Sequence, residues 1–197
     1  MNSHRMGSAI LAIVLSAVLV ESGCNVNWIN MAVGDIPVVL DIVTSILGIV
    51  AIAHGKGQAD PGMVADVQNI GAQAKADLTT VQKLVNDYKT AATADKPGVL
   101  GKIDAALSAA KKDLEGILVA FHVKDATTQT AIASGVGLAI ATVDAIYSLL
   151  PPAPPSTIVP NARAAKKSPP HQPRKPEDLK NEYNAIVSPD FPDAVIH

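Results

Sequence analysis

The sequence predicts an all-α protein: an up-down-up-down four-helix bundle followed by a proline-rich, largely disordered C-terminal tail. Three observations support this class. Hydrophobic residues make up 48% of the 197 residues but aromatic residues only 3%, and the Ala, Val, Ile and Leu that remain suit helix packing better than a β-sandwich. Apolar residues recur every three or four positions over long segments. No segment shows the strict alternation that is typical of a half-buried strand.

Residues 1–23 have the pattern of an export signal. Arg5 lies in a short polar head, the apolar run 6–20 follows, and the small residues Ser22 and Gly23 come next. The apolar run is shorter than the roughly 20 residues that a bilayer-spanning helix needs. This length favours a signal that is removed over a permanent anchor.

Ser22, Gly23 and Cys24 also match the last three positions of a lipobox, and here the sequence resembles bacterial lipoproteins. In that family the signal ends in Leu, a small residue, Gly or Ala, and then a Cys that is diacylated and becomes the first residue. Glu21 departs from the pattern, because it stands where the family has Leu or a similar residue. The resemblance covers residues 1–24 and implies lipidation at Cys24, export, and anchoring to a membrane of the bacterial cell envelope.

Two alternatives for this segment stay open. Ordinary signal-peptidase cleavage after Ser22 would leave a soluble protein with a free thiol, and an uncleaved segment would remain as an anchor. Cys24 is the only cysteine, which excludes an intramolecular disulfide. An odd cysteine in an exported protein calls for an explanation, and acylation supplies one.

Residues 24–35 are expected to form a short linker, followed by a helix over 36–54. Asp35 is placed to cap this helix and Gly55 to end it. The segment is apolar nearly all round. Its small or polar positions form one narrow stripe, which consists of Pro37, Asp41, Thr44, Ser45 and Gly48.

The next two helices are predicted over about 60–91 and 98–122. Asp60 and Pro61 begin the first, and each helix has one apolar seam opposite a charged face. The seam of the first is Val67, Ile70, Ala74, Leu78, Val81, Val85 and Tyr88. The seam of the second is Leu100, Ile103, Leu107, Ala110, Leu114, Ile117 and Phe121.

A fourth helix is predicted over 125–150, with Asp125 as its N-cap. Like 36–54 it is apolar nearly all round, with one stripe of small or polar residues: Thr130, Ser134, Gly137, Ala141, Asp144 and Ser148. The tail, 151–197, holds 11 of the 14 prolines. We expect it to be extended and partly polyproline II, with a short helix at 176–187.

The two apolar helices, 36–54 and 125–150, have more apolar surface than three neighbours in a monomeric bundle readily cover. They either pack at the centre or at an oligomer or partner interface, or they insert into a bilayer. Insertion would place Asp41 or Asp144 in the membrane at about 2.5–3.5 kcal/mol each if central. This cost favours a soluble or peripheral bundle.

Bundle topology brings four residues with metal-ligating side chains to one pole: His54, Asp60, His122 and Asp125. Two imidazoles and two carboxylates would suit a divalent metal. The alternative, which we favour, is that these residues cap helices and complement helix dipoles.

No other pattern in the chain indicates chemistry. The stretch "GKGQADPG" at 55–62 lacks the features of a phosphate loop and is expected to be a turn. One helix face, expected to be solvated, carries Asp104, Lys111, Lys112, Asp113 and Glu115. We therefore expect no enzymatic activity, no cofactor and no small-molecule substrate. A net charge of −2 is too small to indicate nucleic-acid binding.

The basic residues of the tail are the best candidates for membrane or partner contact: Arg163, Lys166, Lys167, Arg174 and Lys175. The sequence as a whole favours a non-enzymatic, exported, membrane-tethered bundle that acts as a structural or interaction module. Its partners would be membrane lipid through Cys24, and a second copy or an envelope protein through 36–54 and 125–150. The alternative is a holin-like or pore-like protein in which those two helices insert.

Overall fold

The computed structural model describes the backbone of residues 6–151 and 175–197, and side chains from Asn27 onward within these ranges. The described part contains α1 (Met6–Gly55), α2 (Pro61–Thr90), α3 (Lys96–Ala120), α4 (Ala126–Ser148), α5 (Pro176–Val187) and the 3-10 helix η1 (Pro192–Ala194). No strand occurs within these ranges. The all-α prediction is therefore confirmed.

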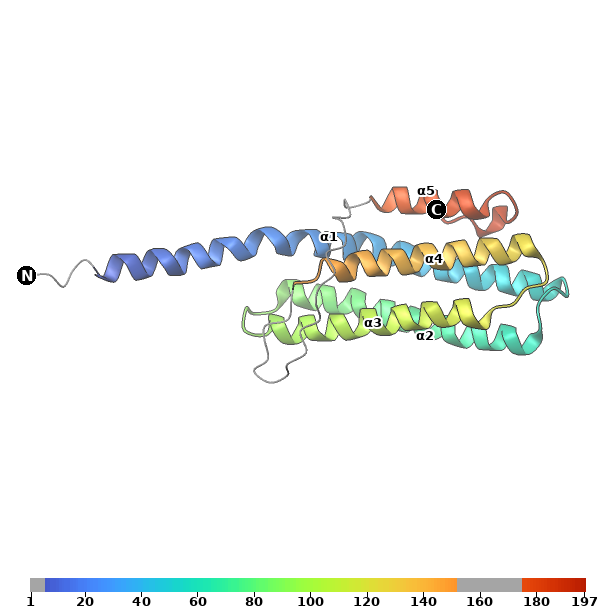
Figure 1. The fold of residues 1–197 in the computed structure, drawn as a ribbon, viewed down its shortest axis with the longest axis horizontal. Coiled ribbons are helices and arrows are strands. Elements are labelled where there is room, and N and C mark those ends of the chain that lie inside the picture. The colour runs from blue at the N-terminus through green and yellow to red at the C-terminus, as the bar shows by residue number, and fades with distance from the viewer. Residues whose placement is uncertain (1–5, 152–174) are drawn as a thin grey trace, which may run out of the picture.

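The helices α1 to α4 form the predicted up-down-up-down four-helix bundle (Figure 1). α1 packs against α2 and α4, and α3 packs against the same two helices, while the backbones of the diagonal pairs lie farther apart. Short connections join consecutive helices, which makes each one antiparallel to the next. α1 continues beyond the bundle at its N-terminal end, as a single helix that projects from it (Figure 1).

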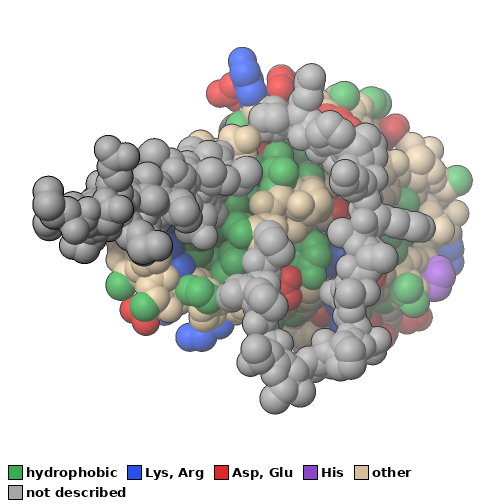
Figure 2. Space-filling view, turned by 60° about the vertical axis from the view of Figure 1, so that its left-hand side comes forward, with side chains coloured by type: hydrophobic (Ala, Val, Ile, Leu, Met, Phe, Trp, Pro, Cys, Tyr) green, Lys and Arg blue, Asp and Glu red, His purple; other side chains and the backbone are tan. Residues whose placement is uncertain are grey.

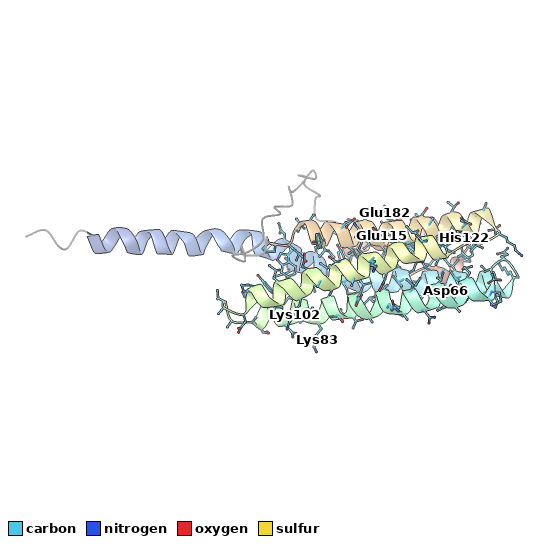
Figure 3. The ribbon with its side chains drawn as sticks, turned by 60° about the horizontal axis from the view of Figure 1, so that its bottom comes forward. Asp66, Lys83, Lys102, Glu115, His122 and Glu182 are labelled. Carbon is cyan, nitrogen blue, oxygen red and sulfur yellow. The ribbon has the colours of Figure 1, made fainter. Side chains whose placement is uncertain are left out.

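The predicted seams of the two middle helices lie in the core. Val67, Leu78 and Val81 of α2 are fully buried. The same holds for Ile103, Leu107, Leu114 and Ile117 of α3. Their charged faces point to solvent, where Asp66, Lys83 and Lys102 lie on the outside of the bundle (Figure 3).

The prediction of a linker over 24–35 is wrong, because these residues belong to α1. Trp28, Ala32 and Ile36 are almost completely buried, and their spacing of four residues continues the apolar face of the helix toward the N-terminus. The ring of Trp28 packs edge-on against Tyr88 of α2, with 5.1 Å between ring centroids. Pro37, a residue type that is common in the first turn of a helix, lies inside α1, where it removes one backbone hydrogen bond and its ring crowds the carbonyl of the preceding turn.

The prediction of an extended tail over all of 151–197 is wrong for its C-terminal part. The predicted short helix at 176–187 is confirmed as α5. However, α5 and η1 are not isolated: they pack against the outside of α1, and α5 also packs against α4 (Figure 1). Leu179, Tyr183 and Val187 are buried there, because their spacing of four residues gives α5 one apolar face.

Candidate functional site

Several of the predicted contact residues lie outside the described side chains. Cys24 is within α1, but its side chain is not described. Arg163, Lys166, Lys167 and Arg174 fall between the two described ranges. Lys175 is described: it is exposed and precedes α5. Lipidation and a basic contact surface therefore remain predictions.

The four residues predicted at one pole do lie at the same end of the bundle. An isolated antiparallel β-bridge between Ala59 and Val123 joins the α1–α2 connection to the α3–α4 connection. In addition, the Lys124 amide donates to the Gln58 carbonyl at 3.0 Å. His54 and His122 are both exposed. Among the described residues, no group of three or more His, Cys, Asp or Glu side chains is arranged to hold a metal ion.

The two aspartates of this pole cap helices. Asp60 accepts a hydrogen bond from the Gly62 amide at 2.8 Å, at the start of α2. Asp125 accepts from both the amide and the hydroxyl of Thr128, each at 2.7 Å, at the start of α4. Both bonds lower the pKa of Asp125 below its usual value, and the bond from the Thr128 hydroxyl has the larger effect.

We expected the charged face of α3 to be solvated, but Lys111 on this face is bonded to another helix. Lys111 Nζ donates to both carboxylate oxygens of Asp144 on α4, at 2.8 and 2.9 Å. This bond is the main cause of the raised pKa of Lys111. Asp144 therefore has a structural role that the sequence did not indicate: it joins α4 to α3.

The most specific contact surface in the described structure is the outer face of α1 and α4, where α5 and η1 are docked. We call α5, η1 and the residues after them, 176–197, the C-terminal cover. The hydroxyl of Ser45 on α1 is central to it: Tyr183 Oη donates to Ser45 Oγ at 2.7 Å, and Ser45 in turn donates to the Ala194 carbonyl at 2.5 Å. Burial raises the pKa of Tyr183 above its usual value, so the phenol keeps the proton that it donates.

Small residues let the C-terminal cover approach closely. A Cβ added at Gly135 of α4 would lie 3.0 Å from the Tyr183 ring and 3.3 Å from Ile46. A Cβ added at Gly34 of α1 would lie 2.7 Å from Pro176. Glycine at these two positions therefore fits the space that the cover requires, since a larger side chain would push α5 away.

One sequence feature marks this surface. Ser45 belongs to the stripe of small and polar residues on α1, and it is the residue of this stripe that hydrogen-bonds to the cover, whereas Asp41, Thr44 and Gly48 are exposed. Around it, a shallow groove is lined by Asp41, Thr44, Ser45, Gly48 and Ile52 on α1 and by residues 193–197 of the cover. The stripe therefore lies beside the cover, and the cover is fixed to it through Ser45.

Two described helices are long and apolar enough to cross a membrane, namely residues 27–55 of α1 and α4. About half of the most apolar window in each is buried inside the bundle. Core helices of soluble proteins have the same properties, so this composition supports membrane association only weakly. The end of the bundle where α1 enters displays hydrophobic side chains (Figure 2). Ile29, Val99, Leu149 and Leu150, at the helix ends that meet here, are half-buried.

Comparison of the chain with known protein families, with characterised proteins and with solved structures finds no match.

Proposed function

We propose that the protein is an exported, non-enzymatic helical bundle that is tethered to a membrane at its N-terminal end and acts as a structural or interaction module. The observation that carries this proposal is the position of the core relative to Cys24. Among the side chains that the structure describes, which begin at Asn27, Trp28 is the first buried one, and it lies one helical turn after Cys24 in the same helix. A lipid on Cys24 would therefore hold the end of the bundle at the bilayer.

A retained signal would orient the bundle in the same way as a lipid on Cys24. If the signal were retained, α1 would connect it to the bundle without a break, and the same end of the bundle would face the membrane. The half-buried apolar residues at that end, such as Leu149 and Leu150, would then lie near the lipid. The basic residues that we predicted for membrane contact, between 163 and 175, would add attraction to anionic headgroups of about 1 kcal/mol each.

A non-enzymatic role is supported by what the described polar side chains do. Asp60 and Asp125 cap helices, and Asp144 pairs with Lys111. Ser45 hydrogen-bonds to two residues of the C-terminal cover. The most elaborate contact surface is thus made for packing a helix, which fits an interaction module.

The test is the intact mass of the mature protein from membranes, together with alkaline carbonate extraction of Cys24→Ala. A lipid tether predicts a mature chain that begins at residue 24 with added acyl mass, and release of Cys24→Ala by carbonate. Asn25→Ala, which leaves the thiol in place, is the matched control and should stay with the membrane. Retention of Cys24→Ala in the membrane would contradict the lipid tether and favour an uncleaved anchor or inserted helices.

A further inference from the structure

We draw no further inference here: the strongest candidate, the shallow groove between α1 and residues 193–197, carries none, because its sign of a binding site is limited to two exposed aspartates, Asp41 and Asp193, and nothing in the described structure shows what would occupy it.

Discussion

The pair α2 and α3 differs from the pair α1 and α4 in what lies on the outer faces of the helices. The outer faces of α2 and α3 carry charged residues such as Asp66, Lys83 and Lys102, which are exposed to water. The described parts of α1 and α4 contain no lysine or arginine, and α5 packs against both helices while η1 packs against α1. A bundle helix that is apolar nearly all round thus indicates an additional packing partner, which here comes from the same chain.

The comparison also explains why the stripe of small residues on α1 exists. On α2 and α3 the polar positions form wide faces, as expected for a solvated helix. On α1, Ser45 provides a hydroxyl for Tyr183 and Ala194, and on α4, Gly135 leaves room for the Tyr183 ring. Ser45 and Gly135 therefore lie where α5 comes close, whereas Gly48 and Gly137 have no atom within 4 Å of an added Cβ.

The largest effect should come from removing the aromatic ring that fixes the cover. Tyr183→Ala should reduce the free energy of unfolding by about 3–5 kcal/mol, as for other large buried side chains. Tyr183→Phe, which removes only the hydrogen bond to Ser45, should cost about 1 kcal/mol. Both are measured by urea denaturation followed by circular dichroism.

Asn181→Ala, on the exposed side of α5, is the control and should change stability by less than about 0.5 kcal/mol. If the cover opens as a separate unit, amide exchange in Tyr183→Ala should accelerate in 176–197 and remain slow in α2 and α3. An equal acceleration in α2 would show that the two pairs of helices and the cover form one cooperative unit.

A smaller effect is expected from filling the space beside the cover on α4. Gly135→Val should cost about 1–3 kcal/mol, because its methyl groups would overlap Tyr183 and Ile46. Gly137→Val is the matched control: a Cβ there meets no atom within 4 Å, and its effect should stay within about 0.5 kcal/mol since valine is the better helix former. Thermal unfolding of both variants measures the difference. Equal losses at both positions would mean that close packing of the cover is not the reason for glycine at 135.

Much of the four-helix bundle could be predicted from the sequence because its determinants are local. The steps of three and four residues from Val67 to Tyr88 and from Leu100 to Ile117 place one seam on each middle helix. Asp60 and Asp125 mark two helix starts through side-chain bonds to amides that are two or three residues away.

The start of α1 was predicted too late, because two local signals for a helix start conflict with the tertiary packing that extends the helix toward the N-terminus. Asp35 and Pro37 are typical of a helix start, but the packing of Trp28 against Tyr88 continues the helix past them. The docking of the cover was missed for a similar reason. The pattern of Leu179, Tyr183 and Val187 predicts a helix, whereas its location depends on Ser45 and Gly135, which are far away in the sequence.

The smallest effect concerns the ion pair that connects the two pairs of helices, Lys111 on α3 and Asp144 on α4. Both side chains are partly exposed, by 36% and 46%, so a double-mutant cycle with Lys111→Met and Asp144→Asn should give a coupling energy of about 0.2–1 kcal/mol. Lys112→Met, at an exposed neighbouring position, is the control and should show no coupling to Asp144.

The pH dependence of this coupling has a defined sign. The hydrogen bond with Asp144 raises the pKa of Lys111 above 10.5 in the folded protein, against the opposing effect of burial. A group whose pKa is raised on folding contributes stability that is complete below its unfolded pKa and is lost as the pH rises through its folded pKa. The coupling measured by urea denaturation should therefore be constant around neutral pH and disappear above the folded pKa of Lys111. Because the cycle subtracts the titration of all other groups, a coupling that persisted in strong base would mean that Lys111 and Asp144 interact through packing of the lysine side chain rather than through its charge.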